Sequence, residues 1–187
     1  SLQGRRVAVQ GLGAMGGRVA ALLAREGAVI VASETDAARA EAVAAKVPLT
    51  LVAPEAIYDQ AVDLFCPCAT SGILTVQTTE RLAAARVKGV VGAANNQLAT
   101  SEVDALLQQR GIRYAPDYAV NSGAIVLAAR ESLERRFDTR EAIAALPDRV
   151  EETVSRIFEA SDARRQPPGT VADRLADDAL VRPRSTE

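Results

Sequence analysis

The chain has 187 residues, of which 48% are hydrophobic and 25% are charged, and its formal net charge is −2. This composition is typical of a globular α/β protein with one core, and it excludes a disordered chain. The sequence shows no apolar run long enough to span a membrane, no signal-peptide pattern and no basic stripe for nucleic acid, so we expect a cytoplasmic protein.

Three residue types narrow the possible chemistry. The chain has no histidine, which excludes histidine-based nucleophilic catalysis, metal ligation and proton transfer. Cys66 and Cys68 flank Pro67, and we expect buried, reduced thiols because the pair is too close for an unstrained disulfide and too small for a zinc site. The two lysines, Lys46 and Lys88, are expected at the surface. The sequence therefore predicts no metal site.

The first two thirds of the chain alternate between strand and helix patterns. Short apolar runs indicate strands, and apolar residues spaced three and four apart indicate helices. The predicted strands are 6–10, 28–33, 48–52, 62–66, 89–92 and 112–115. The predicted helices are 14–26, 36–45, a short turn at 53–58, 78–85 and 101–110. This order predicts a Rossmann-type α/β fold, with a doubly wound, mostly parallel six-stranded sheet and helices on both faces.

After Asn121 the pattern is helical only. The predicted helices are 122–136, 139–161 and 171–180, and Pro147 leaves open whether the second of them is interrupted. A polar segment at 164–169 predicts a break before the last helix, and 181–187 is expected to be a frayed tail. We therefore divide the chain into a Rossmann domain, 1–136, and a helical extension packed on it, 137–187.

A glycine pattern directly follows the first predicted strand, because Gly11, Gly13 and Gly16 stand at the start of the next helix. In such a turn the first glycine permits a tight bend, the second lets the backbone approach phosphate, and the third allows close helix packing. The N-terminus of the helix offers free N–H groups and a positive dipole end to a pyrophosphate. This context predicts a dinucleotide-binding domain, and a purely structural glycine turn is the alternative.

An acidic residue at the end of the second strand bears on the choice of dinucleotide. Glu34 stands where a ribose-binding carboxylate is expected, and its charge would repel the 2′-phosphate of NADP. The pattern therefore favours NAD. The alternative for Glu34 is a solvated acid at a helix start, where Asp36 is the expected N-cap.

Small and amide residues follow strands four, five and six. These segments are 66–72, 93–97 and 116–123. Ligands in open α/β sheets bind outside the carboxyl ends of the strands, so we expect these segments to line the site. Turn formation or helix capping is the ordinary alternative for an isolated asparagine, but Asn95, Asn96 and Asn121 together favour a cofactor surface.

Five segments, in this order, resemble the cofactor domain of the glutamate, leucine, phenylalanine and valine dehydrogenases. They are Val7–Gly13, Phe65–Ala69, Gly92–Gln97, Tyr114–Gly123 and Ala172–Ala176. The resemblance covers most of the chain. Within the family, the sequence is most similar to the branch that acts on apolar amino acids. The resemblance implies reversible, NAD-linked oxidative deamination of an L-amino acid to a 2-oxo acid and ammonia.

The resemblance also implies a set of residues for each ligand. The cofactor set is Gly11, Gly13, Ala14, Met15, Gly16, Glu34, Thr35, Cys68, Ala69, Ala94, Asn95, Asn96 and Asn121. The substrate set is Asn96, Ile125 and Ala128. Ile125 and Ala128 lie one helical step apart, and this apolar pair suits a branched aliphatic or aromatic side chain better than glutamate.

One departure from the family is large. The catalytic lysines and aspartate of the family lie in a separate N-terminal domain, and nothing in this chain matches them, so we expect no catalytic residue here. The chain begins at Ser1, where the cofactor domain of the family begins. We therefore expect the cofactor half of a homo-oligomeric dehydrogenase, which binds NAD but does not turn over. The alternative is a stand-alone NAD-binding or regulatory protein.

Overall fold

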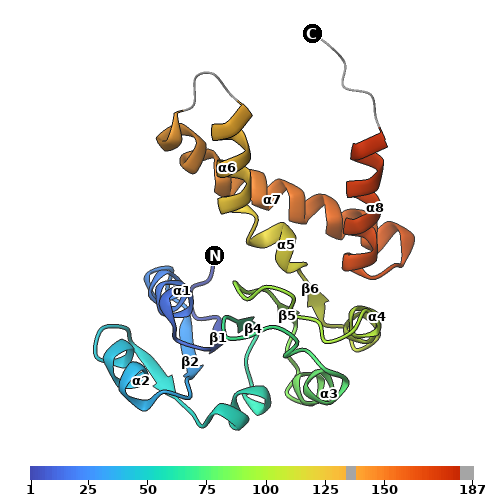
Figure 1. The fold of residues 1–187 in the computed structure, drawn as a ribbon. Coiled ribbons are helices and arrows are strands. Elements are labelled where there is room, and N and C mark those ends of the chain that lie inside the picture. Colours follow the sequence, from blue (N-terminus) through green and yellow to red (C-terminus); the bar gives the residue numbers. More distant parts are fainter. Residues whose placement is uncertain (134–137, 182–187) are drawn as a thin grey trace.

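The computed structural model describes residues 1–133 and 138–181. Six parallel strands form one sheet in the order β3-β2-β1-β4-β5-β6 (Figure 1). The strands are β1 (Arg6–Gln10), β2 (Val29–Ser33), β3 (Leu49–Leu51), β4 (Leu64–Pro67), β5 (Gly89–Val90) and β6 (Arg113–Tyr114). The chain crosses from β3 past β1 to β4, which places the switch point of the doubly wound sheet between β1 and β4. The predicted Rossmann-type fold is confirmed.

Helices cover both faces of this sheet. They are α1 (Ala14–Arg25), α2 (Ala37–Ala44), the 3-10 helix η1 (Pro54–Asp59), α3 (Val76–Ala84) and α4 (Glu102–Gln109). Successive residues of a strand point to opposite faces, and β1 follows this rule. Its residues Val7 and Val9 pack in a core cluster with residues of α1, whereas Ala8 packs in a second cluster with residues of η1, α3 and α4.

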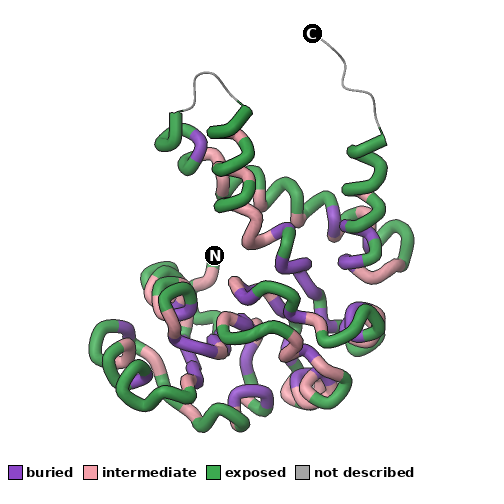
Figure 2. Tube along the Cα trace, viewed as in Figure 1, coloured by how far each residue is buried: buried purple, intermediate pink, exposed green. Residues whose placement is uncertain are grey.

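The described residues after β6 form four helices. They are α5 (Asp117–Val120), α6 (Gly123–Leu133), α7 (Thr139–Arg164) and α8 (Pro168–Val181). In Figure 1, α6 and α8 project from α7 away from the sheet. A small third core cluster, formed by Ala119, Ile157 and Ala172, joins α5, α7 and α8. The helix α6 buries none of its described residues, and Figure 2 shows how exposed these projecting helices are.

The structure settles one open point of the C-terminal helices and differs from the prediction at others. Pro147 does not interrupt α7, which the sequence left open, whereas α8 begins at Pro168 rather than at residue 171, because proline suits the first turn of a helix. The break at 164–169 is shorter than predicted and turns through Arg165, whose φ is +52°. The short helix α5 was not predicted. The predicted end of the helix at 122–136, the division at 136/137 and most of the frayed tail lie outside the described residues.

Candidate functional site

The glycine turn lies between the carboxyl end of β1 and the start of α1. Gly11 has a φ of +87°, in the left-handed region that glycine adopts without strain. A Cβ on Gly11 would lie 2.8 Å from the Cβ of Ala69, and a Cβ on Gly16 would overlap the carbonyl oxygen of Gly11. The fold itself therefore requires glycine at both positions.

Gly13 differs from these two glycines. Its φ is −61°, which other residues also adopt, and no atom of the described residues lies within 4 Å of an ideal Cβ at this position. A side chain here would project into open space beside the first turn of α1. No described side chain caps this turn, and it contains no acidic residue, so its N–H groups and positive dipole end remain available to an anion.

Glu34, the residue after β2, is tied to the same turn by hydrogen bonds from backbone N–H groups. Its Oε2 accepts from Leu12 at 2.9 Å. Its Oε1 accepts from Thr35 at 2.8 Å and from Asp36 at 3.1 Å. Burial of this side chain, which is 6% exposed, would by itself raise the pKa of Glu34, but the backbone hydrogen bonds outweigh burial and lower the pKa to about 2. Glu34 is therefore ionised at neutral pH and keeps lone pairs for a hydroxyl group.

A cation lies beside this carboxylate. The guanidinium of Arg39 is 3.2 Å from Glu34 Oε1 and 3.3 Å from Asp36 Oδ2. Asp36 also caps α2 by accepting a hydrogen bond from the Arg39 N–H, which confirms the predicted N-cap. An arginine near a ribose-binding carboxylate is a group that accommodates a 2′-phosphate. The carboxylate that the sequence analysis expects to bind a ribose thus has a guanidinium beside it that the sequence analysis missed.

A pocket of about 390 Å³ opens at the carboxyl ends of β1, β2 and β4. Six residues of the predicted cofactor set line it, namely Gly11, Gly13, Glu34, Thr35, Cys68 and Ala69. Seven lining residues lie outside that set, namely Gln10, Ser33, Arg39, Pro54, Glu55, Tyr58 and Thr70. The structure therefore brings the glycine turn and the segments after β2 and β4 to one cavity, and adds η1 as a further wall.

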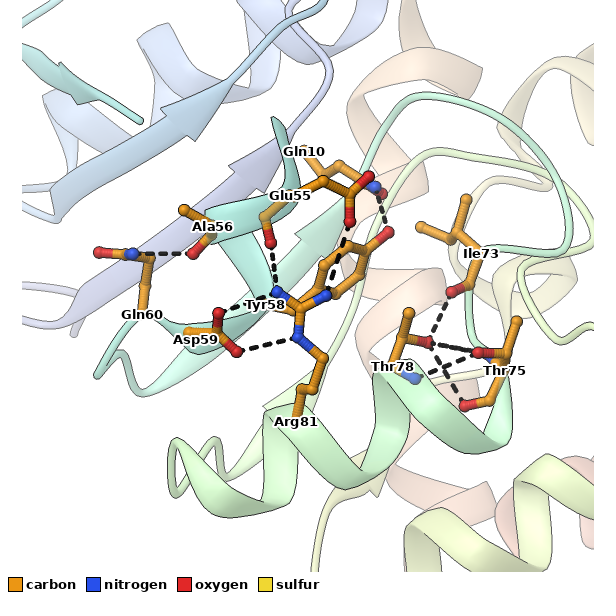
Figure 3. Close-up of polar contacts among 10 residues, drawn as sticks. All are labelled: Gln10, Glu55, Ala56, Tyr58, Asp59, Gln60, Ile73, Thr75, Thr78 and Arg81. Carbon is orange, nitrogen blue, oxygen red and sulfur yellow. Dashed lines mark hydrogen bonds and ion pairs between the residues drawn. The ribbon is translucent and has the colours of Figure 1, made fainter. Parts of the chain in front are cut away.

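The helix η1 is held in place by α3. The buried Tyr58 of η1 accepts a hydrogen bond from the side-chain amide of Gln10 at 2.6 Å. Arg81 of α3 stacks over the Tyr58 ring, 5.1 Å from its centroid, and donates to both carboxylate oxygens of Asp59 at 2.9 and 2.8 Å. It also donates to the carbonyl of Glu55 (Figure 3). These contacts fix the wall of the pocket that η1 supplies.

The remaining predicted cofactor residues do not line this pocket. Ala14, Met15 and Gly16 form the first turn of α1, and the Met15 side chain is exposed. The loop after β5 carries Ala94, which is buried, and Asn95, which is exposed. Asn95 accepts a hydrogen bond from the Asn121 side chain at 2.6 Å, so the structure does bring these two strand-end asparagines together.

Asn96 lies apart from its neighbour. It has a φ of +50°, as a turn-forming asparagine does, and its N–H donates to Asp117 at 2.9 Å. It lines a separate cavity of about 240 Å³ with Asp117 and Asp104. The adjacent Gln97 is fully buried and donates to the carbonyls of the preceding loop at 2.9 and 2.8 Å. Gln97 therefore shapes the loop that presents both asparagines.

Ile125 and Ala128 of the predicted substrate set lie on α6, outside the 390 Å³ pocket. Both are exposed, and the Ile125 side chain is 74% exposed. Ile125 is an apolar side chain that is largely exposed in this chain.

The two lysines lie away from the pocket. Lys46 and Lys88 are both exposed, as predicted. Lys88 pairs with Asp63 at 2.7 Å, and it immediately precedes β5, whereas the pocket opens at the carboxyl ends of the strands. Lys46 also lies before a strand, separated from β3 by Val47 and Pro48. Both cysteines are free, with Cys66 buried as predicted and Cys68 only half-buried.

The described residues contain no group of three or more cysteine, aspartate or glutamate side chains arranged to hold a metal ion. Among residues 1–133 and 138–181, no helix has the length and apolar character needed to cross a membrane.

Comparison with known proteins identifies what this chain is similar to. A family model described as Glutamate/Leucine/Phenylalanine/Valine dehydrogenase matches residues 33–182. A leucine dehydrogenase of Thermoactinomyces intermedius is 33% identical over 186 residues, which are 100% of this chain and 49% of that protein. A phenylalanine dehydrogenase of Caldalkalibacillus thermarum is 42% identical over 132 residues, which are 68% of this chain and 35% of that protein.

A solved structure is also similar over nearly the whole chain. The crystal structure of L-tryptophan dehydrogenase from Nostoc punctiforme has a TM-score of 0.87 and 34% sequence identity, covering 95% of this chain and 52% of that one. The present chain spans about half the length of the leucine and tryptophan dehydrogenases that it matches.

Proposed function

This chain belongs to the glutamate/leucine/phenylalanine/valine dehydrogenase family, and from that premise we propose that it is the NAD-binding part of an L-amino-acid dehydrogenase. The parent enzyme would oxidatively deaminate an apolar L-amino acid to a 2-oxo acid and ammonia, and would be a homo-oligomer. We assign dinucleotide binding to residues 1–136 and a supporting role to the helices of 137–187.

The observation that carries this proposal is the open space at Gly13. Gly11 and Gly16 are explained by contacts within the protein, but no contact among the described residues requires the missing side chain at Gly13. A glycine that lets phosphate approach the backbone next to an uncapped helix N-terminus gives such a reason. This cradle supports a fit between the residues present and a dinucleotide pyrophosphate.

The residues of the chain would then divide the cofactor among them. Gly13, Ala14 and Met15 would hold the pyrophosphate through the N–H groups of the first turn of α1. Glu34 would accept a hydrogen bond from the adenosine ribose through a carboxylate oxygen that already has its charge stabilised. NAD, when bound, supplies the hydride acceptor.

The strand-end amides and the apolar side chains would position the reacting parts. The contact between Asn95 and Asn121 supports their place on the nicotinamide side, and Asn96 would approach both cofactor and substrate. Ile125 and Ala128, exposed on α6, would meet the substrate side chain together with residues from the other half of the parent enzyme. The apolar pair supports an aliphatic or aromatic amino acid as substrate.

We further propose that this chain alone does not catalyse the reaction. Both lysines lie at the amino ends of strands, opposite the edge at which the pocket opens, so neither amine can serve the candidate site. The same observation favours, as a second candidate, a stand-alone NAD-binding protein without chemistry of its own. Incubation of the chain with NAD and L-leucine, L-valine or L-phenylalanine should produce no NADH absorbance, and measurable turnover would refute this proposal.

Gly13→Ala tests the pyrophosphate site. We expect the free energy of unfolding to change by less than about 1 kcal/mol, because the added methyl group meets no described atom. Calorimetric titration should show NAD affinity reduced about tenfold or more, equivalent to about 1.4 kcal/mol. Gly17→Ala is the matched control, since its Cβ would face Val43 of α2 at an ordinary 3.4 Å rather than the pocket. Unchanged NAD affinity in Gly13→Ala would contradict the proposal.

A second experiment tests the choice of NAD over NADP. Glu34→Ala should erode the preference for NAD for two reasons. It removes the negative charge that repels a 2′-phosphate, and it removes the ion pair between Glu34 and Arg39. Adding Arg39→Ala should abolish any NADP affinity that Glu34→Ala has gained. Equal affinity of the unsubstituted chain for both dinucleotides would refute the assignment of Glu34 to the ribose.

A further inference from the structure

The two cysteines form a close pair at the edge of the candidate pocket. Their Sγ atoms are 3.7 Å apart and both thiols are free. Cys66 lies in β4 and is buried in the core cluster beneath α1, whereas Cys68 is half-buried and lines the 390 Å³ pocket. One cysteine of the pair thus borders the pocket, and the other is enclosed behind it.

The surroundings make the two thiols chemically different. The hydrogen bond from Cys66 lowers the pKa of Cys68 to about 7, against the opposing effect of burial, and the backbone N–H of Ala93 lowers it further. The same hydrogen bond, together with burial, raises the pKa of Cys66. Cys68 also lies against the first turn of α1, where a Cβ on Gly16 would be 3.0 Å from the Cβ of Cys68.

We propose that Cys66 and Cys68 form a peroxide-oxidisable dithiol that lowers dinucleotide affinity when it closes to a disulfide. The Cys68 thiolate attacks one oxygen of hydrogen peroxide, the O–O bond breaks, and the products are Cys68 sulfenic acid and hydroxide. The Cys66 sulfur then attacks the Cys68 sulfur, the S–O bond breaks, and water leaves with the Cys66 proton. The two thiols lose two electrons and the peroxide gains them.

The disulfide would disturb the glycine turn because Cys68 is linked to it directly. Because only Pro67 separates the two cysteines, the disulfide is a strained one, and the two sulfurs must close from 3.7 Å to about 2.05 Å. The Cys68 N–H donates to the carbonyl of Gln10 at 2.8 Å, and the next residue, Ala69, contacts Gly11 so closely that a Cβ there would be 2.8 Å away. Any shift of Cys68 therefore displaces the start of the turn. This consequence for affinity rests on the proposed function, whereas disulfide formation does not.

The disulfide is tested by treating the purified chain with hydrogen peroxide, denaturing it, alkylating free thiols and measuring the intact mass. We expect the treated, unsubstituted chain to have no thiol left to alkylate and a mass lower than that of the reduced chain by two hydrogens. Dithiothreitol should restore both thiols. Cys66→Ser should instead keep a Cys68 sulfenic acid that dimedone traps, and Cys68→Ser should keep an unreacted Cys66. Two remaining thiols in the treated chain, or disulfides only between chains, would overturn the proposal.

The effect on the pocket is tested by calorimetric titration of NAD into the reduced, oxidised and re-reduced chain. We expect the oxidised chain to bind NAD at least about tenfold more weakly and the re-reduced chain to recover. Peroxide treatment of Cys66→Ser, which cannot form the disulfide, controls for oxidation of Cys68 alone. A chain with the disulfide and unchanged NAD affinity would refute the coupling. Failure of the reduced chain to bind NAD would refute the proposed function instead, and the mass measurement would still decide the disulfide.

Discussion

Replacing Glu34 by glutamine tests the electrostatics of the candidate site without any ligand. Glutamine keeps the shape of the side chain and one acceptor oxygen, but it removes the charge that the backbone N–H groups stabilise. The pKa of Glu34 is lowered from 4.5 to about 2. Because this carboxylate lines an open pocket, solvent reduces the energetic effect of the shift, and we expect Glu34→Gln to lose about 1 to 2 kcal/mol of folding free energy at neutral pH.

The sign of the effect fixes its pH dependence. Because the pKa of Glu34 is lower in the folded chain, its contribution is complete above a pH of about 4.5 and is lost as the pH falls towards about 2. Urea unfolding followed by circular dichroism, repeated from about pH 7 to about pH 3, should therefore show a Glu34→Gln deficit that shrinks below about pH 4.5. Contributions from other titrating groups cancel in the difference between the two proteins.

A matched control is available on the neighbouring helix. Glu41 of α2 is exposed, so Glu41→Gln should change the free energy of unfolding by no more than about 0.5 kcal/mol at any pH in this range. The reasoning would be wrong if Glu34→Gln matched its control at neutral pH. It would also be wrong if the deficit persisted undiminished at about pH 3.

Two further substitutions test contacts outside the turn. Asp104 of α4 is 4% exposed and caps α8 by accepting from the Thr170 N–H at 3.1 Å, so Asp104→Ala should lose about 1 kcal/mol in urea unfolding. Burial raises the pKa of Asp104, so Asp104→Asn, which keeps the cap without the charge, should be at least as stable at neutral pH; a loss equal to that of alanine would contradict this. Arg81→Ala should lower the urea midpoint of unfolding and weaken NAD binding measured by calorimetry, and Arg81→Lys should not restore either, because lysine cannot bond both oxygens of Asp59. Unchanged stability would mean that η1 is held by its apolar packing alone.

The elements with strong local signals were predictable from the sequence. The first strand was predicted with its observed bounds, and α1 to within one residue, because glycines mark both ends of a helix with regular apolar spacing. At Pro147 the local sequence does not decide whether the helix continues or is interrupted. Pro147 removes the hydrogen bond to the carbonyl of Ile143, but both residues are exposed, so water can satisfy that carbonyl and α7 continues.

The candidate pocket was predictable only in part, for a physical reason. Glycines and strand-end residues carry their signal in the local sequence, whereas Gln10 and Tyr58, 48 positions apart in the sequence, meet because η1 packs against the central strands β1 and β2. Nothing in the local pattern around Tyr58 distinguishes a pocket wall from a core aromatic. Arg39 was within reach of sequence reasoning, because it stands three residues after the predicted cap Asp36, where side chains on a helix meet.

Substitutions at the three glycines of the turn should survive differently in a selected library of variants. Substitutions at Gly11 and Gly16 collide with the protein itself, so a library sorted by cellular abundance should lose them. Gly13 meets no described atom, so the same library should keep its variants as well-folded chains. Only sorting by ligand binding should remove them. A comparison of the two selections would therefore separate, within six residues, the constraint imposed by folding from the constraint imposed by function.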